Sequence, residues 1–233
     1  MGARLALGTA AFGSDYGVKR DGQPSTLEVV KILQMARRYG IDMVDTAPAY
    51  GRMPDFTGFA VVTKTPYNGA TDPYAVLVHT PDNESWHRGG MEWLLRVGIG
   101  GGFKVGVSVY TPEQLERFLQ YPIEIVQFPL SIVDGRFLPY IPRLRDRGVE
   151  VHARSVFLQG ALLMDSPPVP VPRLDVERCL GYALAQNVDR VVVGVNSERQ
   201  LWDLLHVAPL DVPGINIDDE TIVDPRNWGA VRV

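Results

Sequence analysis

The chain has 233 residues, of which 45% are hydrophobic, so it can bury a sizeable core in one domain. Its 23 basic and 27 acidic residues are mixed along the chain, and the net charge of -4 predicts no binding to nucleic acid or to an anionic membrane. No apolar run is long enough to span a membrane, and the N-terminus lacks the apolar core of a signal peptide, so we expect a cytoplasmic protein. The single cysteine, Cys179, excludes an internal disulfide and lies in a helical apolar pattern.

Eight short apolar runs are predicted strands, and most are followed by a segment with helical periodicity. The strands span 3–8, 41–46, 59–64, 74–79, 103–108, 123–128, 149–154 and 190–195. Most of them are continuously apolar, which is typical of parallel strands that are covered on both faces. The helical segments span 26–40, 86–98, 111–120, 140–148, 175–187 and 197–205.

The predicted helices carry start and stop signals. Thr26 and Thr111 stand where N-caps are expected, and Gly40 and Gly148 stand where helices should end. The glycine cluster at 98–102 is interpreted as the turn that ends a helix. No G-x-G-x-x-G or G-x-x-x-x-G-K-[ST] follows any strand, which disfavours an open doubly wound sheet. The alternation predicts an α/β protein, a (β/α)8 TIM barrel that forms a single domain over residues 1–233.

Two connections between predicted strands are too short for a normal crossover. About a dozen residues separate Thr46 from Phe59, and fewer separate Lys64 from Tyr74, whereas a parallel crossover needs about a dozen or more and usually includes a helix. We therefore predict a reduced barrel in which the helices after the second and third strands are missing or shortened.

Four ionisable side chains lie at or just after the ends of three neighbouring strands. These are Asp45, Tyr50, Lys64 and His79. Because the carboxyl ends of barrel strands share one rim, we expect the four to converge there. A buried ammonium lowers the pKa of a nearby tyrosine, and an aspartate keeps that ammonium in place. The set therefore suits protonation of a carbonyl oxygen by Tyr50 while a hydride reaches the carbon, and hydride requires a nicotinamide cofactor.

The segments LALGTAAFGSDYGV, GIDMVDTAPAYG, VVTKTP, VLVHTPD, VGVSVYTPEQL, IVQFPLSIVD, VHARSVFLQGALL and VVVGVNSERQL together resemble the aldo-keto reductases over nearly the whole chain. The closing IVDPRNW is similar to a branch associated with sugar and polysaccharide genes. The resemblance implies NAD(P)H-dependent reduction of an aldehyde or ketone, sugar-derived in that branch, and a catalytic tetrad of Asp45, Tyr50, Lys64 and His79. It implies NADPH as the cofactor, or less often NADH.

The resemblance also implies a set of cofactor-binding residues. They are Gly8, Thr9, Ser108, Gln127, Arg154, Ser155, Phe157, Leu158, Gln159, Gly160, Gly194, Asn196, Ser197 and Gln200. Ser108 and Gln127 match residues that hold the nicotinamide carboxamide, with capping of strand ends as the alternative. Arg199 is either a contact of a 2′-phosphate or a solvated helix residue. Val109 departs from the family pattern, which has Asn at this position.

Three further residues have no assigned role in the tetrad or the cofactor site. For Tyr16 and Trp228 two interpretations are open, and His152 has a structural interpretation. Tyr16 lines the substrate mouth or packs within a surface loop. Trp228 closes over the site or packs on the barrel wall, and His152 belongs to the core or the barrel floor. No histidine or cysteine has the spacing of a metal site.

Two other function classes fit the same fold. One is a redox-inactive barrel that acts as a binding or regulatory protein, which the missing helices favour and the complete tetrad disfavours. The other is a lyase or isomerase with Lys64 as a Schiff-base nucleophile, which leaves Asp45 and Tyr50 without roles. For partners, we expect a small carbonyl substrate. Because the trimmed side of the barrel should expose apolar strand residues, we also expect a homodimer through it, with the loop 52–58 and the tail 209–233 as lesser covers.

Overall fold

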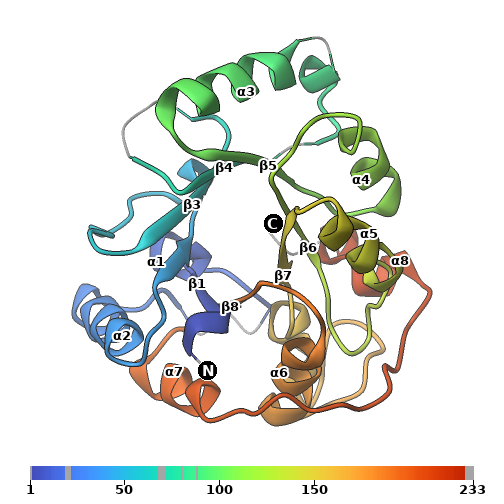
Figure 1. The fold of residues 1–233 in the computed structure, drawn as a ribbon. Helices are drawn as coiled ribbons and strands as arrows, with labels where there is room; N and C mark the ends of the chain where they lie inside the picture. Colours follow the sequence, from blue (N-terminus) through green and yellow to red (C-terminus); the bar gives the residue numbers. More distant parts are fainter. Residues whose placement is uncertain (1, 19–21, 68–71, 80, 88, 229–233) are drawn as a thin grey trace.

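The computed structural model describes residues 2–18, 22–67, 72–79, 81–87 and 89–228. Eight parallel strands close into a barrel in chain order, with the last strand paired to the first (Figure 1). The strands are β1 (Leu5–Gly8), β2 (Met43–Asp45), β3 (Ala60–Lys64), β4 (Ala75–Val78), β5 (Lys104–Ser108), β6 (Ile125–Pro129), β7 (Glu150–Arg154) and β8 (Arg190–Gly194). The predicted (β/α)8 barrel is confirmed, and each predicted strand is present with ends that differ by at most two residues.

Helices ring most of the barrel. They are α1 (Ala10–Gly13), α2 (Thr26–Arg38), α3 (Gly90–Gly101), α4 (Pro112–Phe118), α5 (Ile141–Asp146), α6 (Val176–Ala185), α7 (Glu198–Leu205) and α8 (Glu220–Val223). Short 3₁₀ turns are η1 (Gly2–Arg4), η2 (Pro48–Tyr50), η3 (Glu84–His87), η4 (Leu138–Tyr140), η5 (Leu158–Leu163) and η6 (Pro225–Asn227). Within the described part of the chain, no helix is long and apolar enough to cross a membrane.

The helix ends follow the predicted signals with two exceptions. One is α3, which continues through most of the glycine cluster to Gly101, so that only Gly102, with φ of 70°, ends it. Thr111 caps α4, and a reciprocal bond from Gln114 completes a capping box. Gly40 and Gly148 adopt φ of 78° and 69°, which side chains with a Cβ rarely reach. The cap of α2 is Ser25 rather than Thr26: Ser25 has extended backbone and its Oγ accepts from the Glu28 N–H at 3.2 Å, so Thr26 is already helical.

The side of the barrel between α2 and α3 carries loops in place of helices (Figure 1). Between β2 and β3 the chain forms only η2, and the described residues between β3 and β4 (65–67 and 72–74) contain no helix. Both expected truncations are thus present in the described residues.

The apolar patch expected on that side is largely covered from within the chain. Phe59 is 9% exposed, and the guanidinium of Arg37 on α2 lies 4.6 Å from its ring centroid. Met53 and Phe56 of the loop pack against the core. The described part of the tail runs past α6, where Leu210 N–H donates to the Gly181 carbonyl, and the AVRV end, on which the expectation for the tail rested, lies outside the described residues. The homodimer stays a prediction.

Inward-facing residues alternate along the strands and divide the core in two. Six buried apolar residues fill the barrel interior: Ala6, Met43, Val62, Ala75, Leu77 and Ile125. A larger apolar cluster lies between the strands and the helices. Because side chains alternate with period two, the residue two positions beyond each inward-facing residue also faces inward. This parity decides which polar residues reach the upper rim.

The floor of the barrel is closed by a polar network at the amino ends of the strands. Glu150 at the start of β7 accepts hydrogen bonds from Tyr74 Oη at 2.6 Å and from Lys104 Nζ at 2.7 Å. His152, whose side chain is fully buried as expected for a core or floor residue, contacts the other Glu150 oxygen through Nε2 at 2.7 Å. Burial opposes ionisation of Glu150, but the bonds from His152, Lys104 and Tyr74 outweigh it and hold the pKa well below its usual range.

We predict that Glu150→Gln lowers the free energy of unfolding by about 1–3 kcal/mol, because charge-assisted bonds at a partly buried site are lost. The folded-state pKa is depressed, so this contribution is present above the unfolded pKa of about 4.3 and is lost as pH falls through the folded pKa. Denaturant titrations of both proteins at neutral pH and near pH 3 measure it. The matched change Glu116→Gln, at an exposed ion pair with Arg143, should cost less than about 1 kcal/mol. Equal effects of the two changes would contradict the prediction.

Candidate active site

The parity of β2 and β3 places a buried ion pair at the upper end of the barrel interior. Asp45 and Lys64 follow the interior residues Met43 and Val62 by two positions. Lys64 Nζ lies 2.7 Å from Asp45 Oδ1 and also donates to the Thr46 carbonyl at 3.1 Å. The side chains are only 2% and 7% exposed. Such a pair persists in a core only when its geometry is good and the remaining lone pairs are satisfied.

The second oxygen of Asp45 is satisfied from across the barrel. Gln127 on β6 donates to Asp45 Oδ2 at 2.7 Å, and its own carbonyl oxygen accepts from Ser108 Oγ on β5 at 3.1 Å. Both residues are buried. Ser108 and Gln127, which the sequence suggested as cofactor contacts, here orient the carboxylate of Asp45.

Tyr50 lies over this ion pair. It ends the turn η2, and its ring contacts His79 edge-on with centroids 6.2 Å apart. Lys64 Nζ is 5.4 Å from the centroid of the tyrosine ring. The four predicted side chains are therefore brought together at one rim.

The acidity of Tyr50 differs from what the sequence suggested. Burial, with the charge of Asp45 and the neighbouring Tyr110, raises the pKa of Tyr50 far above its usual value, and Arg154 lowers it. The expected lowering by Lys64 is not seen in this structure: Lys64 is paired with Asp45 at 2.7 Å, and the charge that lowers the pKa is that of Arg154. Tyr50 is thus a protonated donor over the whole physiological pH range.

His79 is held neutral. Burial and the nearby charge of Lys64 lower the pKa of His79 to about 4. Its backbone N–H donates to Thr65 Oγ1 at 3.1 Å, which places the residue just beyond β4. A neutral imidazole beside a protonated phenol can donate to or accept from a bound carbonyl compound without carrying charge.

We predict that His79 titrates near pH 4 in the folded protein and that Lys64→Met moves this pKa towards its ordinary value of about 6.5. The ammonium of Lys64 lowers the pKa of His79 and the carboxylate of Asp45 raises it, so removing the ammonium should raise the pKa. Imidazole resonances followed by NMR against pH test this, with His79→Gln for assignment and the exposed His206 as the internal reference. A wild-type pKa above 6 would contradict the assigned environment.

Two adjoining cavities open beside these residues. The larger is a cleft of about 330 Å³ that runs from Thr9, Asp45 and Tyr50 to Gln200 and Asp203 on α7. The smaller, of about 50 Å³, is lined by Lys64, His79 and Tyr110 among others. They share the lining residues Tyr16, Tyr50, Arg154, Ser155 and Gln159.

The wall between the cavities shows two features of a ligand site. Ser155, Leu158 and Gln159 all have positive φ, between 48° and 62°, which is uncommon for residues other than glycine. The side-chain oxygen Oε1 of Gln159 is buried and has no hydrogen-bond partner among the described residues. A buried acceptor without a partner is costly in a closed structure and fits a bound donor.

Most of the predicted cofactor residues line the large cleft. These are Gly8, Thr9, Arg154, Ser155, Phe157, Gln159, Gly160, Gly194, Asn196 and Gln200. Ser108 and Gln127 line the small cavity instead. Leu158 lines neither, because its side chain packs in the core, and Ser197 lines neither, because it caps α7 by accepting from the Gln200 N–H.

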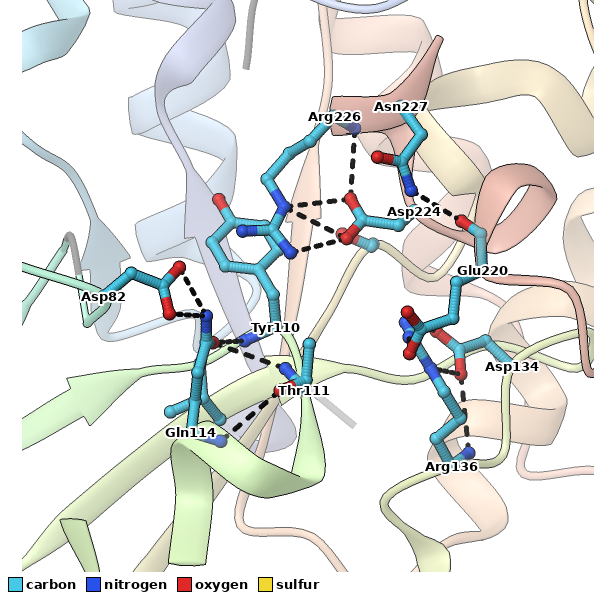
Figure 2. Close-up of polar contacts among 12 residues, drawn as sticks. Asp82, Tyr110, Thr111, Gln114, Asp134, Arg136, Glu220, Asp224, Arg226 and Asn227 are labelled. Atoms are coloured by element: carbon cyan, nitrogen blue, oxygen red, sulfur yellow. Dashed lines mark hydrogen bonds and ion pairs between the residues drawn. The ribbon is translucent and has the colours of Figure 1, made fainter. Parts of the chain in front are cut away.

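Tyr110 and Pro225 line the small cavity and were not predicted. Tyr110 follows β5 by two positions, so its place after a strand end was a usable signal. Two guanidinium groups pack against the ring, with Arg154 at 4.1 Å and Arg226 at 3.7 Å from the centroid. Figure 2 shows Arg226 across the ring, anchored by Asp224. Pro225 and Arg226 belong to the C-terminal segment. Its position beside the cavity depends on tertiary contacts, which no local sequence pattern predicts.

The alternatives left open for two aromatic residues are resolved by position. Tyr16 lines both cavities. Trp228 is 8% exposed, lines neither cavity, and donates to the carbonyls of Thr221 and Ile222, so it packs on the wall. Among the described residues, no cluster of histidine, cysteine and carboxylate side chains could hold a metal ion.

The fold is that of solved aldo-keto reductases. A protein of Pseudomonas aeruginosa described as an aldo-keto reductase aligns with a TM-score of 0.69 and 22% identity over 88% of this chain and 89% of its own. An aldo-keto reductase from Bacillus halodurans, in its holo form, aligns with a TM-score of 0.67 and 18% identity over 89% and 88%. A thermostable aldo-keto reductase in complex with the inhibitor epalrestat gives 0.60 and 19% over 90% of each chain. No family model matches the sequence, and no curated protein matches it.

Proposed function

We propose that this protein is an oxidoreductase that reduces an aldehyde or ketone with a nicotinamide dinucleotide as cofactor. The observation that carries the proposal is the assembly of Asp45, Tyr50, Lys64 and His79 at one end of the barrel, beside a cleft long enough for an extended ligand. The likeness of the fold to aldo-keto reductases supports it. A sugar-derived substrate stays a prediction from the closing IVDPRNW.

The residues of the cleft fit such a cofactor. The unpartnered Oε1 of Gln159 offers an acceptor for an amide or hydroxyl donor at the wall shared by both cavities. At the other end, Asn196 and Gln200 stand at the start of α7, in a predicted adenosine-phosphate site. The cofactor, when bound, supplies the hydride. Gln159 would bind the end near Tyr50, and Asn196 and Gln200 the far end.

The chain's own residues handle the proton. Tyr50 Oη donates its proton to the carbonyl oxygen of the substrate as that oxygen gains charge. Lys64 is held against Asp45, with Nζ 5.4 Å from the centroid of the Tyr50 ring, and Gln127 and Ser108 hold Asp45 in place. The charge of Arg154, which lowers the pKa of Tyr50, favours the phenolate that Tyr50 becomes. Neutral His79 orients the carbonyl oxygen by hydrogen bonding.

We predict that Tyr50→Phe reduces turnover of an aldehyde by about 10²–10⁴-fold, because the general acid is lost. The affinity for reduced cofactor should change little, since most of the cleft lies along β7, β8 and α7. Steady-state assays and a fluorescence titration with NADPH measure the two effects. Tyr121→Phe, a tyrosine outside both cavities, serves as the matched control. Wild-type turnover by Tyr50→Phe would refute the assignment of the acid.

The alternatives have less support. As a Schiff-base nucleophile, Lys64 would have to leave both Asp45 and the Thr46 carbonyl, to which it donates. A redox-inactive binding protein would not need a protonated tyrosine beside a buried ion pair. If the protein binds NADPH but none of the carbonyl compounds tested causes its oxidation, the binding function is favoured.

The preference for NADPH over NADH stays a prediction, and two contacts on α7 weigh against it. Arg199, for which contact with a 2′-phosphate was one of two interpretations, is 82% exposed and pairs with Asp203 at 3.1 Å. The Glu198 N–H, at the first turn of α7, donates to Glu28 Oε1 of α2 at 2.7 Å. A carboxylate already lies at the helix end that would otherwise favour an anion.

We predict that Glu28→Gln raises the affinity for NADPH relative to NADH by roughly 3- to 10-fold, because a negative charge is removed from the N-terminus of α7. The ratio of the two dissociation constants, from fluorescence titrations at fixed salt, is the readout. Glu116→Gln changes the same charge on the distant α4 and should leave the ratio unchanged. An unchanged ratio in Glu28→Gln would contradict the prediction that the Glu28 carboxylate disfavours NADPH.

A further inference from the structure

The small cavity carries one positive charge that the described residues do not compensate. Lys64 lines it but is paired with Asp45 at 2.7 Å. His79 is neutral at physiological pH. Arg154, at the end of β7, lines both cavities and makes no ion pair with a carboxylate among the described residues. A half-buried cation without a partner favours an anionic ligand.

The guanidinium of Arg154 is held in one orientation. Its Nη2 donates to the Val109 carbonyl at 3.0 Å, and its Nη1 donates to Ser155 Oγ at 3.1 Å. Its plane lies over Tyr110, 4.1 Å from the ring centroid. A guanidinium has five N–H donors, so these contacts leave donors available for a ligand. A group fixed in this way loses little freedom when it binds.

Arg226 differs from Arg154 although it faces the same ring. Its guanidinium lies 3.7 Å from the centroid of the Tyr110 ring, and Asp224 binds it through both carboxylate oxygens, at 2.6 to 3.0 Å (Figure 2). Its charge is therefore compensated within the C-terminal segment. Arg226 packs against the ring with its charge paired to Asp224, whereas the charge of Arg154 is unpaired and lies at the cavity.

We propose that the substrate is a short carbonyl compound that carries a carboxylate, and that Arg154 binds this carboxylate while Tyr50 faces the carbonyl oxygen. The inference rests on the proposed reductase function. The volume of about 50 Å³ favours a small acid over an extended molecule. A planar guanidinium matches a carboxylate by paired N–H donors, which gives specificity as well as affinity.

Two pairs of compounds test the proposal: 4-oxobutanoate with its methyl ester, and 2-oxobutanoate with its methyl ester. Each pair differs only in the charge of the group. With NADPH or NADH, the wild-type protein should show a kcat/KM at least roughly 10-fold higher for the acid of one pair. Arg154→Met should lower the ratio of acid to ester by roughly 10- to 100-fold, and Arg154→Lys should restore part of it.

The ratio separates binding of the substrate from binding of the cofactor, since Arg154 lines both cavities. If Arg154 serves the cofactor only, Arg154→Met weakens the dissociation constant of NADPH and leaves the ratio unchanged, which overturns the proposal. Arg143→Met removes one charge from the outer surface and should leave the ratio unchanged. Preference of the wild-type protein for both esters also overturns it.

A measurement without turnover distinguishes failure of the inference from failure of the reductase function. Saturation-transfer NMR on the cofactor-free protein compares binding of each acid and ester. Binding of an acid that Arg154→Met abolishes, with no oxidation of NADPH or NADH, supports the carboxylate site and argues against the reductase. Reduction of the esters, without preferential binding of the acids, supports the reductase function and overturns the carboxylate site.

Discussion

The site depends on the carboxylate of Asp45, because each of its oxygens binds a different part of the barrel. One oxygen holds Lys64 of β3, and the other accepts from Gln127 of β6, which in turn binds Ser108 of β5. An ammonium in this position would be destabilised by burial without the carboxylate. A single side chain on β2 thus sets the positions of groups on three other strands, and Tyr50 and His79 are placed around the result.

In the described residues, the connections after β2 and β3 contain no full helix, and this leaves the arrangement intact for a geometric reason. The polar side chains point into the barrel, whereas the helices of such barrels cover its outside. Loss of helices therefore changes the packing on the outer faces of β2 and β3 and leaves the inner ones alone. The loop with Met53 and Phe56, and Arg37 over Phe59, take over part of the outer packing. The barrel floor is closed by the polar network around Glu150.

Electrostatics divides the site into a compensated part and an uncompensated part. Lys64 is paired with Asp45, and Arg226 is paired with Asp224. Arg154 alone among the described lining residues of the small cavity is a cation without a carboxylate partner. Tyr110 contacts both parts, because its ring packs against the guanidinium of Arg154 and against that of Arg226. In this way the C-terminal segment contributes to the site although its aromatic residue, Trp228, packs elsewhere.

Local sequence was sufficient wherever a periodic pattern or a fixed offset carried the information. Continuous apolar runs identified eight strands, since a strand covered on both faces has no other composition. Polar residues at strand ends identified Asp45, Lys64 and His79, because parity and strand polarity send them to one rim. The short connections after β2 and β3 identified the missing helices by length alone. The offset between Ser25 and Thr26 as the cap of α2 shows the limit, since both residues are suitable and only the backbone angles decide.

Tertiary structure decided what depends on contacts between distant parts of the chain. The pKa of Tyr50 is raised rather than lowered, because burial and the charge of Asp45 outweigh the opposing charge of Arg154. Leu158 packs in the core, whereas its neighbours Phe157 and Gln159 line the cleft. Tyr110 meets Arg226 only because 116 positions of chain fold the tail back onto β5. No periodicity encodes such a contact, since it depends on the path of the whole barrel.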